Sequence, residues 1–131
     1  MLRPKSLDHL ALKVTDMDKT LHFYHQLLGL ELLRTSGPDV DGGRSAVLKV
    51  GGQEINVFSG PAFVPGANDN FAGIDHFCLN MDVASIDEII ADLRQAGIDT
   101  VRGPVERRDG TSVFVYDPDG IHVELRLAKG P

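Results

Sequence analysis

The segment LDHLALKVT, residues 7–15, decides the fold of this chain. Its leucine and valine side chains alternate with His9 and other polar or small residues, and this period of two predicts a strand with one buried face. The segment IDHFCLNM, residues 74–81, has the same pattern, and its His76 follows His9 by 67 positions (76 − 9 = 67). A strand that returns with its histidine in place indicates an internal repeat.

Each copy of this strand is followed by the same series of elements. Gly29 and Gly97 end the two predicted helices (97 − 29 = 68), and Gly52 and Gly120 lie in the turns before the two last strands (120 − 52 = 68). The predicted elements are a helix capped by Asp16 or Asp18 and strands at 30–35, 44–50 and 53–59 in the first copy, and a helix capped by Ser85 with Glu88 and strands at 98–102, 111–116 and 121–127 in the second.

The repeat predicts the architecture. A four-stranded sheet with one helix leaves one of its faces uncovered, so the two copies are expected to pair. We expect an α+β fold in which two paired βαβββ modules form a curled mixed sheet around a central cavity, with the helices outside. Residues 1–131 are expected to form one domain, with module 1 at about 7–59, a Gly-, Pro- and Asn-rich linker at 60–73 and module 2 at about 74–127.

The composition argues against several functional classes. A formal charge of −6 and a pI near 5.2 are unfavourable for nucleic acid or an anionic membrane surface, because both partners require clustered Lys and Arg. We find no stretch with the roughly 20 apolar residues of a membrane span and no secretory signal. The single cysteine cannot form an internal disulfide and is typical of a reducing compartment, so we expect a cytoplasmic protein.

Strand alternation places three metal-binding side chains on the inner face of the predicted sheets. On the last strand the odd-numbered apolar residues face the helix, so Glu124 faces the cavity, and the same parity turns His9 and His76 inward. Two imidazoles and one carboxylate are the ligand set of a divalent first-row metal with open coordination positions. The alternative is two hydrogen-bonded core histidines and a carboxylate paired with Arg126 or Lys13, but histidines at repeat-equivalent positions favour the metal.

Four motifs, distributed over nearly the whole chain, resemble those of one known family. They are Leu7-Asp8-His9-Leu10, then Phe23-Tyr24 with Leu28-Gly29-Leu30, then Asp75-His76-Phe77, and finally Asp117-Pro118-Asp119-Gly120 followed by Glu124. The family is the vicinal oxygen chelate superfamily, which includes glyoxalase I, bleomycin-binding proteins, extradiol dioxygenases and fosfomycin-resistance enzymes. The resemblance implies paired βαβββ modules, metal ligands at His9, His76 and Glu124, and one divalent ion per site, which is Zn, Ni, Mn or Fe.

Several positions depart from particular members of that family. Glyoxalase I has a second glutamate, both ligand and catalytic base, at the position matching Asn56 (124 − 68 = 56), and an amide cannot abstract a proton. Asn56 stays a candidate fourth ligand or substrate contact, and Glu54 on the same face is a candidate base. Extradiol dioxygenases carry a tyrosine where this chain has Phe114, a candidate substrate contact, and fosfomycin enzymes have a threonine where this chain has Ala11.

Four further candidates lie on the inward faces of the second module. His122 is a candidate acid or base, or else a partly exposed residue at the cavity mouth. Tyr116 is a candidate proton donor, or simply the end of its strand. Arg126 is a candidate contact for an anionic substrate group, with a solvated rim charge as the alternative. Cys78 is a candidate substrate contact close to the metal, with an inert buried thiol as the alternative.

The sequence thus predicts a metal-dependent enzyme that acts on a small oxygen-rich molecule. A lyase or isomerase similar to glyoxalase is favoured slightly over a dioxygenase. The alternative is a metal-free ligand-binding protein, like the drug-sequestering members of the family that the chain resembles. Relatives with two modules often pair them across chains, so the resemblance also implies a homodimer in which His9 of one chain joins His76 and Glu124 of the other.

Overall fold

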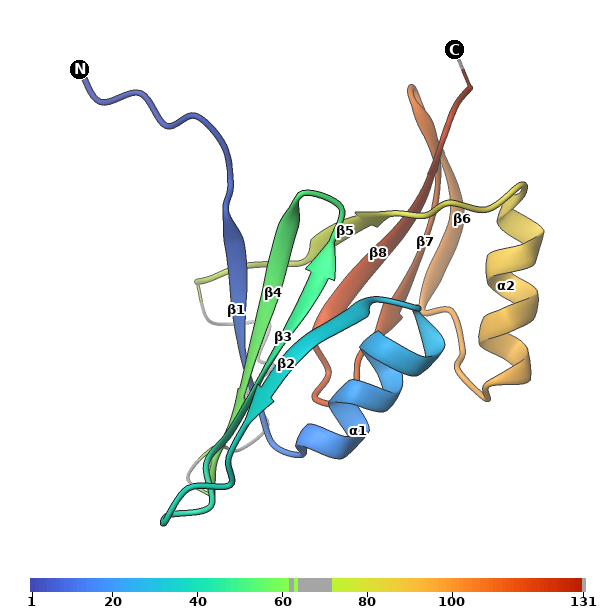
Figure 1. The fold of residues 1–131 in the computed structure, drawn as a ribbon. Helices are drawn as coiled ribbons and strands as arrows, with labels where there is room; N and C mark the ends of the chain where they lie inside the picture. Colours follow the sequence, from blue (N-terminus) through green and yellow to red (C-terminus); the bar gives the residue numbers. More distant parts are fainter. Residues whose placement is uncertain (62, 64–71, 131) are drawn as a thin grey trace. The chain divides into compact units, whose positions relative to one another are not determined.

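The computed structural model describes residues 1–61, 63 and 72–130, and it divides the chain into two compact units, residues 1–66 and 67–131 (Figure 1). Each unit has the order strand, helix, three strands, so the prediction of two βαβββ modules is confirmed. In the described part of the chain the strands form two separate four-stranded mixed sheets and no closed barrel. Most of the predicted linker at 60–73 lies outside the described residues.

Unit 1 contains the sheet order β1-β4-β3-β2, which is visible in Figure 1. Its elements are β1 (His9–Val14), α1 (Met17–Leu21), a π-helical segment η1 (His22–Leu27), β2 (Glu31–Ser36), β3 (Arg44–Val50) and β4 (Gln53–Ser59). The strand β1 pairs with β4 in parallel, and the other neighbours pair antiparallel.

Unit 2 repeats this topology with the order β5-β8-β7-β6. Its elements are β5 (Phe77–Asn80), α2 (Ile86–Gln95), β6 (Arg102–Arg107), β7 (Gly110–Tyr116) and β8 (His122–Ala128). Again the first strand pairs in parallel with the last, and the remaining pairs are antiparallel.

The strand registers of the two units coincide residue by residue. In unit 1 Asn56 lies opposite Ala11 on β1. In unit 2 Glu124 lies opposite Cys78 on β5, the position 67 residues after Ala11 (78 − 11 = 67). Asn56 and Glu124 therefore occupy the same place in the two sheets, as the repeat offset predicts.

Each unit buries its own apolar core on the face of the sheet that carries the helix. Unit 1 buries Leu12, Val14, Met17, Phe23, Tyr24, Ala46, Leu48, Ile55 and Val57, and unit 2 buries Leu79, Ile89, Leu93, Val113, Val115, Val123 and Leu125. These side chains follow the alternation of the strands, which leaves the opposite face of each sheet to polar residues. One exception matters for the site: Phe114 is only 1% exposed although its neighbours on β7 put it on that opposite face.

The first helix differs from the predicted single α-helix. After α1 the chain widens into η1, where the Leu28 N–H donates to the Phe23 carbonyl, five residues back, at 3.0 Å. Phe23 and Tyr24 are both buried, with their rings edge to face at 4.9 Å. The π-helical segment thus places both of these consecutive aromatic side chains in the core of unit 1.

The strand predicted at 98–102 is wrong, because β6 runs from Arg102 to Arg107. The residues before β6 are still tied to the helix end, where Gly97 has a φ of 76° and the Ile98 N–H donates to a helix carbonyl at 2.9 Å. Pro104 is typical of a loop, yet β6 is an edge strand with an irregular register, where a proline does not interrupt the sheet.

None of the helices in the described residues is long and apolar enough to cross a membrane.

The cap of α2 gives a test of the local fold. Ser85 Oγ accepts the Glu88 N–H at 3.3 Å, and the Glu88 carboxylate accepts the Ala84 N–H at 3.3 Å. We expect Ser85→Ala to lower the free energy of unfolding by about 1 kcal/mol, because one helix N–H loses its partner. Urea denaturation measures the change, and Ser85→Asp, which keeps an acceptor oxygen, is the control. Equal losses in both variants would show that the cap is not the cause.

Candidate metal centre

Glu124 is the buried charge at the centre of unit 2. It lies on β8 and is 7% exposed, and Ser112 Oγ on the neighbouring β7 donates to its Oε2 at 2.6 Å. Burial raises the pKa of Glu124, but the Ser112 hydrogen bond, the Arg107 charge and His76 outweigh burial, so the pKa lies below its ordinary value. Glu124 is therefore ionised at neutral pH, which is the state that a metal ligand requires.

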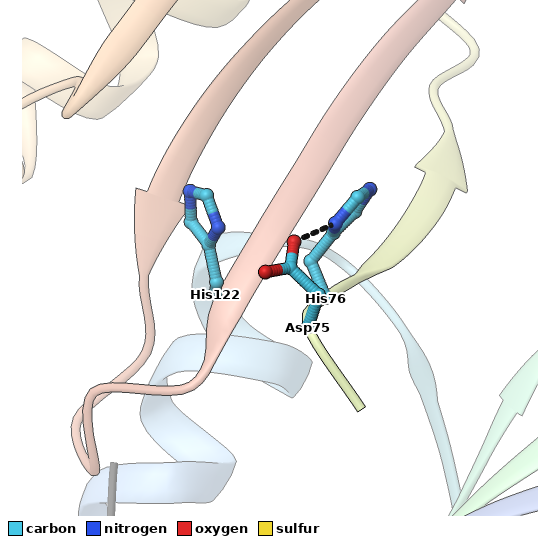
Figure 2. Close-up of side chains that lie close together, drawn as sticks. All are labelled: Asp75, His76 and His122. Carbon is cyan, nitrogen blue, oxygen red and sulfur yellow. Dashed lines mark hydrogen bonds and ion pairs between the residues drawn. The ribbon is translucent and has the colours of Figure 1, made fainter. Parts of the chain in front are cut away.

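His76 brings a second ligand atom to Glu124. It lies directly before β5, which begins at Phe77 and not at residue 74 as predicted. Its Nε2 is 3.0 Å from Glu124 Oε1. Its Nδ1 is 2.6 Å from Asp75 Oδ2, and Figure 2 shows this contact as a dashed line. The imidazole is thus placed between two carboxylates.

This arrangement fits a cation better than it fits a neutral histidine alone. A neutral imidazole has one N–H and can satisfy only one of the two carboxylates. If Nδ1–H of His76 bonds to Asp75, the Nε2 lone pair faces the anionic oxygen of Glu124. A metal ion at that point satisfies both atoms, and a carboxylate on the far nitrogen is the usual partner of a metal-binding histidine. The alternative is a protonated His76 that bridges the two carboxylates.

The distance between the two atoms agrees with a shared ion. Ligand atoms that each lie about 2.1 Å from a metal and subtend a right angle are about 3 Å apart. The separation of His76 Nε2 and Glu124 Oε1 is 3.0 Å. The pair can therefore hold a divalent ion without moving its backbone.

Unit 1 repeats part of this arrangement. His9 Nδ1 lies 2.9 Å from Asp8 Oδ2, the same contact that Asp75 makes with the second histidine. Asn56 Oδ1 is buried and has no hydrogen-bond partner among the described residues. A buried amide oxygen without a partner is costly. At the place equivalent to Glu124, this oxygen fits a neutral ligand or a substrate contact. Glu54, another predicted residue, lies opposite His9 in the parallel register.

A second grouping of possible ligands exists in unit 2. Asp75, His76 and His122 each offer one ligand atom, and these atoms lie within 4.8 Å of one another (Figure 2). Asp75 is the weakest member, because its side chain is 86% exposed and its carboxylate already holds His76 Nδ1. We regard Asp75 as the group that orients His76 and not as a ligand.

The remaining predicted residues of the second module form a wall of rings beside the pair. His122 lies opposite Tyr116 in the sheet, and its ring centroid is 5.3 Å from that of Tyr116, 5.0 Å from that of Phe114 and 5.8 Å from that of His76. Tyr116 is 52% exposed. His122 thus lies beside His76 in unit 2.

Arg126 and Cys78 have surroundings that bear on their predicted roles. The Arg126 guanidinium bonds to Asn80 Oδ1 at 2.7 Å and to the Asp109 carboxylate at 2.9 Å, so its charge is already neutralised. Partial burial and the negative charge of Glu124 raise the pKa of Cys78 to about 11. The thiol is therefore protonated at neutral pH and is a poor nucleophile.

The sequence prediction missed three features of the site. The Asp–His pairs could have been found, because an aspartate precedes both repeat histidines. Ser112 could have been found by parity, since it lies two residues before Phe114 on the inward face of β7. The side chains of β6 were missed because the strand was expected to begin four residues and to end five residues too early.

The fold and the site together place this chain in a class of proteins. The class is built from two repeated four-stranded modules, and here one module carries a histidine–carboxylate pair suited to a metal ion. Residues 6–125 match the model of the Glyoxalase/Bleomycin resistance protein/Dioxygenase superfamily, and the chain belongs to this superfamily. The resemblance found in the sequence is thereby confirmed.

Individual relatives support a glyoxalase-like role without specifying the reaction. The chain is 33% identical over 124 residues to a virulence protein of Salmonella typhimurium, with 91% of this chain and 81% of that protein covered. It is 31% identical over 125 residues to a lactoylglutathione lyase of the same organism, with 92% and 91% covered. It also superimposes on the structure of a glyoxalase/dioxygenase from Nostoc punctiforme with a TM-score of 0.82 at 26% identity, covering 99% and 97%.

Metal binding can be measured directly, and the variants distinguish the two groupings. After a chelator has removed any bound metal, we expect the protein to bind about one Mn²⁺ or Ni²⁺ per chain in a calorimetric titration. Glu124→Ala should weaken binding by more than the roughly 10–100-fold that loss of an outer-sphere partner costs, because a ligand is removed. Glu106→Ala, which removes an exposed carboxylate on β6, is the control. If Glu124→Ala keeps full affinity for the metal and His122→Ala loses it, the metal binds instead at the grouping of Asp75, His76 and His122.

Proposed function

We propose that this protein is a metal-dependent lyase or isomerase that acts on a small oxygen-rich molecule. The observation that carries the proposal is the pairing of His76 Nε2 with Glu124 Oε1 at 3.0 Å. A hydrogen bond on the other side-chain atom orients each partner: Asp75 contacts His76 Nδ1, and Ser112 donates to Glu124 Oε2. Such fixed ligands suit a catalytic ion that keeps open positions for substrate.

The chain's own residues would divide the work as follows. His76 and Glu124 would hold the divalent ion, which when bound would act as a Lewis acid toward two adjacent substrate oxygens. His122 is our first candidate for moving a proton, because its ring lies beside that of His76 and an imidazole can both accept and donate a proton. Glu54 is the second candidate base, and Tyr116 is the candidate proton donor.

Unit 1 would complete the ligand set. We propose His9 as the third ligand because Asp8 holds its Nδ1 in the same way as Asp75 holds that of His76. This contact leaves Nε2 of His9 available. Asn56 would add a neutral oxygen to the ion or to the substrate, which would also satisfy its unpartnered Oδ1.

A metal-free ligand-binding protein is the competing function. It would need an apolar pocket and would gain nothing from a buried carboxylate, which costs several kcal/mol to desolvate. The Asp75–His76–Glu124 chain of contacts favours the enzyme. Elemental analysis of protein purified without added metal separates the two, since a sequestering protein should carry no stoichiometric ion.

The amide at position 56 limits the reaction. Proton abstraction needs a base that can change its protonation state, and Asn56 cannot. We expect little turnover of the hemithioacetal of methylglyoxal and glutathione by the metal-loaded protein in a spectrophotometric assay. Asn56→Glu should raise this activity. Asn56→Gln should not, because glutamine has the size of glutamate but cannot act as a base. Wild-type turnover at a typical enzyme rate of about 10 per second would prove this interpretation wrong and direct attention to Glu54 and His122.

We further propose a homodimer whose sites take His9 from one protomer and His76 and Glu124 of the partner subunit. Mixed dimers test it. His9→Ala and Glu124→Ala chains should each lose tight metal binding alone, whereas a heterodimer of the two should regain about one tight site, because one of its two sites is intact. No recovery in a verified heterodimer, or a monomer by light scattering that still binds metal, would contradict the shared site.

A further inference from the structure

Two arginines of β6 converge on one ring of the candidate site. The Arg102 guanidinium carbon lies 5.1 Å from the centroid of the Phe114 ring, and that of Arg107 lies 5.9 Å from the same centroid. Both distances are within the range of a cation–π contact. Both guanidinium groups therefore lie beside the same ring.

The Phe114 ring lies on the strand next to the candidate ligand Glu124. Arg102 is opposite Phe114 in the β6–β7 pairing, and Phe114 is opposite Glu124 in the β7–β8 pairing. The arginines are thus separated from the buried carboxylate by one strand.

Neither guanidinium has a carboxylate within ion-pair distance in the described part of the chain. By contrast, Arg44 pairs with Asp18 at 3.0 Å and Arg126 pairs with Asp109 at 2.9 Å. Both guanidinium groups are therefore available to an anion, and guanidinium groups bind oxyanions with paired hydrogen bonds.

We propose that Arg102 and Arg107 form an anion-binding pair that receives a carboxylate or phosphonate group of the substrate. This inference deepens the proposed function and rests on it: the adjacent oxygens of the same molecule would bind the metal at His76 and Glu124. The substrate class is then a small molecule with two neighbouring oxygens and a separate oxyanion. Arg126, the arginine favoured by the sequence pattern, would instead support the sheet through Asn80 and Asp109.

The first experiment isolates the arginine pair from the metal. Binding of inorganic phosphate and of acetate to metal-free protein is measured by chemical-shift titration, which separates tetrahedral from planar oxyanions. We expect Arg102→Gln/Arg107→Gln to weaken the preferred anion by about 10–100-fold, the usual worth of charged hydrogen bonds. Arg108→Gln, which removes the adjacent exposed charge without a contact to Phe114, should have little effect. No measurable binding of either anion to the wild type, or equal binding to the double variant, overturns the proposal.

The second experiment joins the pair to the metal. Malate and lactate both offer a hydroxyl and a carboxylate to a bound ion, but only malate has a further carboxylate. The Mn²⁺-loaded wild type should prefer malate by about 10-fold or more, and the double variant should lose this preference while it keeps its affinity for lactate. An unchanged preference in the double variant, or none in the wild type, counts against the pair. If Mn²⁺ itself fails to bind, the proposed function fails, and the phosphate and acetate titrations still decide the anion site.

Discussion

The burial of the Glu124 carboxylate is the constraint on which the site in unit 2 depends. An unpaired carboxylate at 7% exposure would cost several kcal/mol in desolvation. The structure offsets this cost from both neighbouring strands. Ser112 on β7 takes one oxygen, and His76 at the start of β5 faces the other. Because β8 lies between those two strands, the topology itself supplies the partners of the charge.

The same topology in unit 1 surrounds an amide instead of a carboxylate. Asn56 occupies the register position of Glu124, yet it carries no charge and leaves its Oδ1 without a partner among the described residues. The two repeats are therefore equal in backbone and unequal in chemistry. This inequality leaves only one of the two equivalent positions with a carboxylate, and it removes from the other the base that a symmetric pair of glutamates would provide.

The sequence predicted what depends on periodicity and failed where local geometry overrides it. Alternation and the recurring glycines located β3 and β4 with their observed ends, and the serine cap located α2. The wide turn at η1 could not be predicted, because consecutive buried aromatics fit the same apolar spacing as an α-helix. The shift of β6 was hidden by Pro104. This error also hid the arginine pair, because Arg107 was assigned to a loop and Arg102 was expected to end its strand instead of beginning it.

The position of the arginine pair matters because the whole chain is acidic. A formal charge of −6 repels an anionic substrate at long range, so general electrostatic steering cannot favour its approach. At physiological salt this repulsion decays over about 8 Å, so charges nearer to the substrate than this count for more than distant ones. If the oxyanion binds as we propose, the two guanidinium groups beside the Phe114 ring would lie within that distance and oppose the repulsion. A preference for anionic over neutral molecules would then appear mainly as slower dissociation of the anionic ones, because the favourable charges act only on the bound molecule.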